Sequence, residues 1–211
     1  MERRTRGPGA RHEERRNEIA DAVLAIVAER GLAAVSLTEV AARAGVSPGR
    51  VQHYFPAKQR LVEAAFDRGN ALSAARIRAK VGRDLADAAP RDALTVVLNE
   101  LIAHDAETRA HMRVRQSFTA LALADEAIAA RMRDEYARFH GRVAGLLRRD
   151  RAALPAGTDP DAAAVDLVAH AEGLAYYVLI GITAPDAARA RVARSIAALY
   201  EDGRDREART D

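Results

Sequence analysis

Apolar residues recur along this chain with the spacing of one face of an α-helix. Between residues 13 and 30, the large apolar side chains stand three, four or one residues apart, at Ile19, Val23, Ile26 and Val27. This spacing predicts an amphipathic helix, and Gly31 is the type of residue that commonly follows the last turn of one. The same period continues toward the C-terminus, and no run alternates with the period of two that is typical of a strand.

Further helices are predicted from this pattern and from the residues that begin and end helices. Ser36, with Glu39 three residues later, predicts a capping box that opens a second helix, and Gly45 ends it. Ser47 caps a short third helix, which Pro56 stops. Six longer helices are predicted over residues 57–81, 92–104, 109–124, 126–147, 161–182 and 187–200. We therefore expect an all-α fold of about nine helices.

The composition agrees with a helical fold and excludes several classes of protein. The 211 residues include 49 alanines and nine aromatic residues, and there is no cysteine. Alanine favours helices, whereas strands favour aromatic and β-branched residues. Because cysteine is absent, a disulfide framework, a cysteine-ligated zinc ion and a thiol nucleophile are all excluded.

Positive charge is concentrated in the first part of the chain. Residues 1–60 carry 11 basic and 7 acidic residues, whereas residues 61–211 carry 22 and 23. A basic segment on a nearly neutral body suggests an anionic partner such as nucleic acid, although a solvated tail has the same composition. No apolar run reaches the roughly 20 residues that span a bilayer, and no secretory leader is recognisable. We therefore expect a cytoplasmic protein with no membrane partner.

Residues 37–55 combine the features that a helix-turn-helix requires. Ala41 is small enough for two steeply crossing helices to touch, and Gly45 accommodates a positive φ in the turn. Three valines stand where apolar side chains must join the two helices, namely Val40, Val46 and Val51. The other positions of the second helix are polar, as in helices that read base edges in DNA. A plain helical hairpin would explain any one of these features, whereas DNA binding explains their joint spacing.

A more specific set of residues surrounds this motif. It comprises Ile19, Ala22, Gly31, Ser36-Leu37-Thr38, Val40-Ala41, Ala44-Gly45-Val46-Ser47, His53-Tyr54-Phe55, Lys58 and Leu61. This set resembles the N-terminal DNA-binding domain of TetR-family transcriptional regulators. The rest of the chain resembles the family in helix number and length, and in an Ala-Glu-Gly-Leu segment at residues 171–174. The chain departs from the family pattern at Arg50, where a small hydroxyl residue usually stands.

The resemblance implies a homodimer that binds double-stranded DNA at a near-palindromic operator, with one helix-turn-helix in each subunit. We accordingly divide the chain into a disordered basic arm (1–12), a DNA-binding domain (13–60), a ligand-binding and dimerisation domain (61–202) and a frayed tail (203–211). The arm either reaches DNA or is only a soluble tail. A large monomeric bundle is the alternative to the dimer.

The residues predicted to contact DNA lie on the second helix of the motif and beside it. They are Thr38, Ser47, Pro48, Gly49, Arg50, Gln52, His53, Tyr54 and Lys58. Arg50 suits guanine and Gln52 suits adenine, whereas Lys58 suits a phosphate. Val51 and Phe55 are expected to point into the core. A buried structural role explains Tyr54 as well as a DNA contact does.

The C-terminal body is expected to bind a small-molecule effector and a second subunit. The residues predicted to line the effector pocket are Arg115, Phe118, Tyr136, His140, Glu172 and Tyr177, although aromatic residues on a helical stripe are more often simply core. The helix over residues 161–182 carries apolar residues on two faces, so both faces must be covered. The predicted dimer contacts are Val168, Tyr176, Val192, Ile196 and Leu199.

Other functional classes have little support in the sequence. It contains no Gly-rich phosphate loop, no His-Glu-x-x-His motif and no nucleophile elbow, so we expect neither an enzyme nor a cofactor. His104 and His111 stand near Glu100 and Asp105, but lone histidines are common and we predict no metal site. The function expected is that of a repressor which an effector releases from its operator. The alternative is a helical DNA-binding regulator or architectural protein without an effector.

Overall fold

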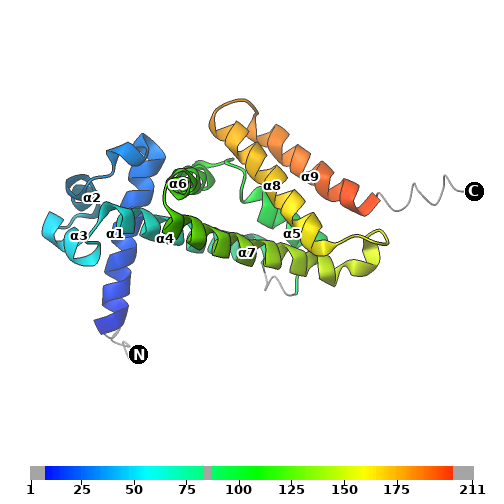
Figure 1. The fold of residues 1–211 in the computed structure, drawn as a ribbon, viewed down its shortest axis with the longest axis horizontal. Helices are drawn as coiled ribbons and strands as arrows, with labels where there is room; N and C mark the ends of the chain where they lie inside the picture. The colour runs from blue at the N-terminus through cyan, green and yellow to red at the C-terminus, as the bar shows by residue number, and fades with distance from the viewer. Residues whose placement is uncertain (1–7, 83–86, 202–211) are drawn as a thin grey trace, which may run out of the picture.

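The computed structural model describes residues 8–82 and 87–201, and every regular element within these ranges is a helix. The nine α-helices of these ranges are α1 (Pro8–Arg30), α2 (Leu37–Ala44), α3 (Pro48–Tyr54), α4 (Lys58–Val81), α5 (Pro90–Asn99), α6 (Ala106–Ala122), α7 (Glu126–Arg149), α8 (Pro160–Leu179) and α9 (Pro185–Glu201). Figure 1 shows an elongated molecule with α1, α2 and α3 at one end and the C-terminal end of α9 at the other. The prediction of an all-α fold is confirmed.

Two helices each have one end that differs by five residues from the sequence prediction, whereas the ends of the other long helices differ by three residues or fewer. Residues 8–12, predicted to belong to a disordered arm, form the beginning of α1, with Pro8 at the first helical position, where a missing N–H costs little. The fifth helix ends at Asn99 rather than at residue 104, and Asp105 then caps α6 by accepting the Thr108 N–H at 2.7 Å. The rest of the arm, residues 1–7, and the tail predicted at 203–211 lie outside the described residues.

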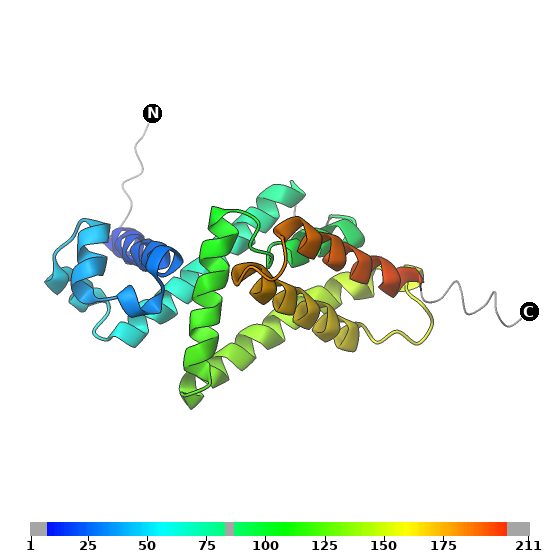
Figure 2. The ribbon, with the colours of Figure 1, turned by 90° about the horizontal axis from the view of Figure 1, so that it is seen from above.

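Two buried clusters of apolar side chains hold the helices together. One cluster joins α1, α2, α3 and the first half of α4 to α6 and the start of α7. The other joins α5, α7, α8 and α9. Figure 2 shows α4 running from the α1–α3 end of the molecule into the body, and α6 crossing α4 where it enters the body. Because α4 begins at Lys58, the domain boundary predicted at residue 60 falls inside its first turn and stays a prediction.

The core does not break where α4 enters the body. Phe66 of α4 stacks on Phe118 of α6, with ring centroids 4.3 Å apart and an interplanar angle of 17°. Both rings belong to the cluster that also buries Val51 and Phe55 from the N-terminal helices. The N-terminal helices therefore share one packed core with α6.

Among the described helices, α8 is long and apolar enough to cross a membrane, judged by length and composition alone. This is weak evidence for a membrane span, because the core helices of soluble proteins pass the same test. One face of α8 packs against α7 and α9 and buries Leu167, Ala171, Leu174 and Val178. Figure 2 shows α8 and α9 lying side by side.

Candidate nucleic-acid interface and internal cavity

The predicted helix-turn-helix is formed by α2 and α3. Gly45 ends α2 in the left-handed conformation, at φ +64°, and the Val46 N–H donates to the Ala41 carbonyl at 3.0 Å. The Ser47 hydroxyl oxygen then caps α3 by accepting the Arg50 N–H at 3.3 Å. The turn glycine and the two helices it connects were thus predicted at the correct residues.

Ion pairs hold α2 against the end of α1. The Ser36 hydroxyl oxygen accepts the Glu39 N–H at 3.2 Å, but the Glu39 carboxylate pairs with Arg30 of α1, so the structure shows one half of the predicted capping box. Arg43 donates to Glu29 of α1 through both of its terminal nitrogens, and this contact lowers the pKa of the Glu29 carboxyl group. The orientation of the helix-turn-helix is therefore set partly by α1.

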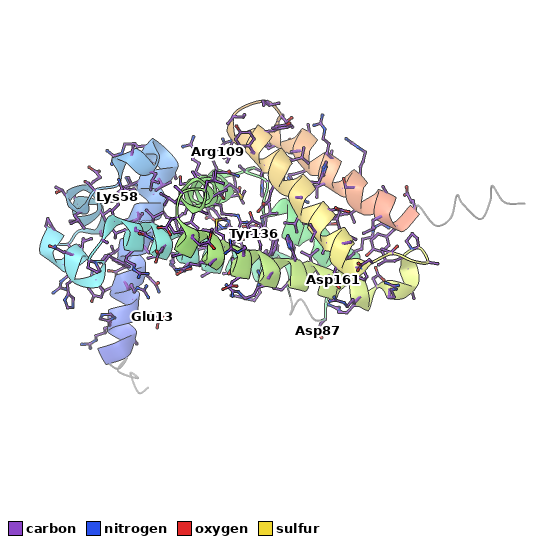
Figure 3. The ribbon with its side chains drawn as sticks, in the orientation of Figure 1. Glu13, Lys58, Asp87, Arg109, Tyr136 and Asp161 are labelled. Carbon is purple, nitrogen blue, oxygen red and sulfur yellow. The ribbon has the colours of Figure 1, made fainter. Side chains whose placement is uncertain are left out.

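The third helix turns its polar side chains toward solvent. Arg50, Gln52 and His53 are exposed, whereas Val51 and Phe55 are 0% and 1% exposed, as predicted. The other exposed residues of the predicted interface are Thr38, Ser47, Pro48, Gly49 and Lys58. Figure 3 shows Lys58 at the α1–α3 end of the molecule, far from Asp161 of α8. The exposed polar surface of α3 has the chemistry needed to read base edges, and contact with DNA stays a prediction.

Tyr54 is half-buried, between the two roles considered for it. Its ring lies 4.6 Å from that of His12 and 5.5 Å from that of His53, measured between centroids. On the same side, the Arg16 guanidinium lies 5.5 Å from the centroid of the Phe55 ring. The first turns of α1 therefore lie beside the end of α3, which the sequence prediction missed because it treated residues 1–12 as an arm.

A cavity of about 610 Å³ lies in the body, between α4, α5, α6 and α7. Its apolar wall includes Phe66, Ile77, Leu101, Phe139, Val143 and Leu146. Its polar wall includes Asn70, Glu100, His111, Arg115, Tyr136 and Arg142. A mostly apolar cavity with a few polar groups is typical of small-molecule binding sites, and this volume lies within their usual range of about 300–1,000 Å³.

A buried polar network connects the cavity wall to α8. Arg115 Nη2 donates to Glu172 Oε1 at 2.5 Å and to the Tyr136 hydroxyl at 3.2 Å, and that hydroxyl donates to Glu172 Oε2 at 2.6 Å. Burial raises the pKa of Tyr136 to about 12, so its hydroxyl keeps the proton that it donates. Figure 3 shows Tyr136 in the middle of the molecule, where α7 passes under α6 and α8. The network joins three helices at one point.

Two further polar groups of the wall are almost completely buried. Glu100 is 1% exposed and accepts from Arg76 Nε at 2.5 Å and Lys80 Nζ at 3.0 Å. His111 is 3% exposed, and its Nε2 lies 3.0 Å from Asn70 Oδ1. Burial, aided by nearby Arg115 and Arg76, lowers the pKa of His111 to about 3, so the imidazole is neutral at neutral pH.

From the sequence, Glu100 and His111 were considered only in connection with a metal site, which was not predicted, and the structure gives them other partners. Within residues 8–82 and 87–201, no group of three or more His, Asp or Glu side chains is placed to hold a metal ion. One signal in the sequence was available for Glu100, because apolar residues stand on both sides of the Asn99-Glu100 pair. A polar group that is buried among apolar residues needs a partner.

Two of the six predicted pocket residues, Arg115 and Tyr136, line the cavity. The other four lie outside its lining, and their contact with an effector stays a prediction. Phe118 is 0% exposed in the core behind Phe66, and Glu172 lies behind the wall, bonded to Arg115. His140 stands beside the Tyr136 ring, outside the lining, and Tyr177 is 46% exposed on the surface of α8.

Some of the predicted dimer contacts are buried in the structure, and others are exposed. Val168, Val192 and Ile196 are each 1% exposed and packed in the core of the chain rather than on its surface. Leu199 is partly buried against the same core, and Tyr176 is 47% exposed. The outward apolar face of α8 instead carries Val165, Tyr176, Tyr177 and Ile180.

Comparison with known proteins agrees with this arrangement. Residues 19–65 match the family model of bacterial regulatory proteins of the tetR family, and residues 90–201 match the model of the C-terminal domain of BetI-type transcriptional repressors. A TetR-family regulator from Rhodococcus sp. has the same fold, with a TM-score of 0.77 and 26% identity over 89% of this chain and 99% of that one. A regulator from Saccharomonospora viridis, solved in complex with choline, superposes with a TM-score of 0.75 and 24% identity over 88% of this chain and 96% of its own.

Curated relatives match over shorter stretches. The regulator PksA of Bacillus subtilis is 33% identical over 111 residues, which are 53% of this chain and 53% of that protein. The regulator BetI of Rhizobium meliloti is 34% identical over 118 residues, or 55% of this chain and 48% of that protein. The match thus spans about half the length of each of these relatives. Family and fold are those of transcriptional regulators rather than enzymes, and the chain belongs to the TetR family of bacterial regulatory proteins.

Proposed function

We propose that this protein is a ligand-responsive transcriptional repressor that acts in the cytoplasm, binds a near-palindromic DNA operator as a homodimer and is released from it by a small molecule. The observation that carries the proposal is the surface of α3. Arg50, Gln52 and His53 project into solvent from a helix that Val51 and Phe55 fix to the core. A short helix held rigidly with donors on its outer face is what base-edge recognition in the major groove requires.

Selection of bound DNA from a random pool tests this proposal directly. The purified full chain is expected to enrich two inverted half-sites separated by about one helical turn or a multiple of it. Enrichment of single half-sites would contradict the dimer, and recovery of DNA without sequence preference would contradict specific recognition.

The outward face of α8 supports the dimer. Val165, Tyr176 and Ile180 are 45%, 47% and 54% exposed and lie along one side of the helix, with the small residues Ala169 and Gly173 between them. An exposed apolar stripe on a helix indicates an interaction surface, and small residues allow another helix to approach closely. Because most soluble oligomers are closed and symmetric, a second copy of this chain is the simplest partner.

The cavity supports release by an effector. Phe66 lines it and also packs in the core that holds α3, so a ligand in the cavity contacts a residue that supports the DNA-binding end. An effector lowers DNA affinity only if it prefers the conformation that binds DNA less well. Titration of the operator complex with a library of small molecules tests this step, and the absence of release by any of them would favour the alternative, a DNA-binding regulator without an effector.

A further inference from the structure

The cavity contains three aromatic faces, and arginine side chains occupy them. The Arg115 guanidinium lies 5.4 Å from the ring centroid of Tyr136 and 6.0 Å from that of Phe66. The Arg142 guanidinium lies 5.5 Å from the centroid of Phe139. A quaternary ammonium ligand binds to aromatic faces through the same cation–π attraction. Such a ligand would have to displace, or share each ring with, a guanidinium of the protein.

The carboxylates of the cavity wall are also matched by cations of the protein. Glu100 accepts from Arg76 Nε at 2.5 Å and from Lys80 Nζ at 3.0 Å. Glu135 accepts from Arg138 at 2.7 Å, and its other oxygen lies 4.0 Å from Arg142. Neither carboxylate is therefore left without a counter-ion to attract a cationic ligand.

The basic residues of the wall outnumber the acidic ones. Four arginines and two glutamates line the cavity. Arg115 is matched by Glu172, and Arg149 donates to the Ala88 carbonyl at 2.7 Å. Arg78 has no ion-pair partner among the described residues, and Arg142 reaches Glu135 only at 4.0 Å. Arg78 on α4 and Arg142 on α7 are both exposed, and Arg142 contacts the Phe139 ring and reaches Glu135 at 4.0 Å. Both guanidinium groups can therefore turn to a ligand in the cavity.

We infer that this cavity binds an amphipathic organic anion, in which an apolar chain or ring system contacts the aliphatic and aromatic wall and an acidic head group pairs with Arg78 and Arg142. The inference rests on the proposed role of the cavity as an effector site. Guanidinium groups bind carboxylates through charge-assisted, often bidentate hydrogen bonds, which supply both affinity and orientation. The excess of arginine disfavours a quaternary ammonium ion of the same size.

Three probes that share one apolar chain and differ in charge test the inference. They are decanoate, decyltrimethylammonium and decanol, each titrated calorimetrically into the full chain below its critical micelle concentration. Decanoate is expected to bind at least tenfold more tightly than decyltrimethylammonium, with decanol between them. Arg78→Gln and Arg142→Gln are each expected to weaken decanoate binding about tenfold or more, and to leave decanol binding unchanged.

A control variant separates the head-group contact from a general loss of positive charge. Arg133 lies on the same helix as Arg142, but it is outside the cavity and pairs with Glu126 at 2.5 Å. Arg133→Gln is expected to bind decanoate like the unaltered chain. Tighter binding of decyltrimethylammonium than of decanoate overturns the inference. The same conclusion follows if decanoate fails to bind, or if Arg78→Gln and Arg142→Gln bind it with unchanged affinity.

Operator binding measured with the same probes distinguishes this inference from the proposed function. If decanoate binds through Arg78 and Arg142 but does not release the operator, the ligand class stands and the effector role fails. If the chain binds no operator DNA at all, the proposed function fails, whereas the calorimetric ranking of the three probes still decides the ligand class.

Discussion

One buried side chain, His111, is expected to make the protein less stable in acid. The imidazole is 3% exposed, and burial lowers its pKa from about 6.5 to about 3 in the folded chain. The unfolded chain therefore binds a proton between these two values while the folded chain does not. The contribution of His111 is fully present above pH 6.5 and is lost as the pH falls toward 3. Below pH 6.5, the free energy of unfolding falls by about 1.4 kcal/mol for each pH unit. The loss between pH 7 and pH 5 is therefore about 2 kcal/mol.

The assay is urea unfolding followed by far-ultraviolet circular dichroism at pH 7, 6 and 5. The protein concentration is held constant, because dissociation of an oligomer would otherwise change the apparent stability. Other groups also titrate in this range, so the measured quantity is the difference between the unaltered chain and His111→Gln, which has no titrating group at this position. His111→Gln is expected to be less stable at pH 7 and to lose about 2 kcal/mol less on acidification.

The structure provides a control for this measurement. His53 is an exposed histidine on α3, and His53→Gln is the matched control in which an imidazole is removed from the surface. If His111→Gln and the unaltered chain lose the same free energy of unfolding between pH 7 and pH 5, then His111 is not the neutral buried group described here. The cause assigned to its lowered pKa, desolvation beside Arg115 and Arg76, would then be wrong.

Three other substitutions test the remaining parts of the structure. Gly45→Val is expected to destabilise the chain by about 1–2 kcal/mol or more, because φ is +64° there. The control Gly49→Ala in α3 is expected to be neutral or stabilising, and equal melting temperatures for the two variants would contradict the left-handed turn at Gly45. Arg50→Ala is expected to cost about 1–3 kcal/mol on specific DNA and to relax one base preference, and an equal loss on every sequence would make Arg50 a phosphate contact. Ile180→Glu is expected to shift the mass measured by sedimentation from twice 22.8 kDa toward that of the monomer. The control Leu123→Glu, at a residue that is 87% exposed and lies outside the α8 face, is expected to leave the mass unchanged. An unchanged mass for Ile180→Glu would exclude the α8 face as the dimer interface.

The sequence predicted the N-terminal helices well because local signals determine them. The turn at Gly45 requires a positive φ, Ser47 caps α3, and Val51 and Phe55 share one face of a short helix. Each of these features involves residues close together in the chain. The start of α1 was missed although its signal was also local, since Pro8 is a favourable first residue of a helix.

The faces of α8 were harder to assign, because the helix is apolar nearly all round. Val165 and Val168 are three residues apart and chemically identical, yet they are 45% and 1% exposed. Periodicity shows that a helix has two apolar faces, but it does not show which one meets its own subunit. That choice depends on how α7 and α9 pack against α8, which is a long-range property.

The cavity was the least predictable feature, because no single helix encodes it. Its wall collects residues from four helices, and a cavity forms where side chains from all four leave space unfilled. Phe118 and Phe66 illustrate the difficulty, since both are buried aromatic residues on helical stripes and only Phe66 borders the space. Arg115 was identified as a polar residue inside the predicted helical body, and the structure buries it and pairs it with Glu172.

Phe66 also explains how a cavity in the body can influence a helix that it does not touch. One side of the Phe66 ring borders the cavity, and its face stacks on Phe118 at 4.3 Å. Phe118 belongs to the same packed cluster as Val51 and Phe55, which hold α3 in place. Packed cores shift between discrete arrangements rather than deforming continuously. A ligand that moves Phe66 must therefore repack this cluster, and with it α3. A ligand that binds to the cavity as it stands leaves DNA affinity unchanged.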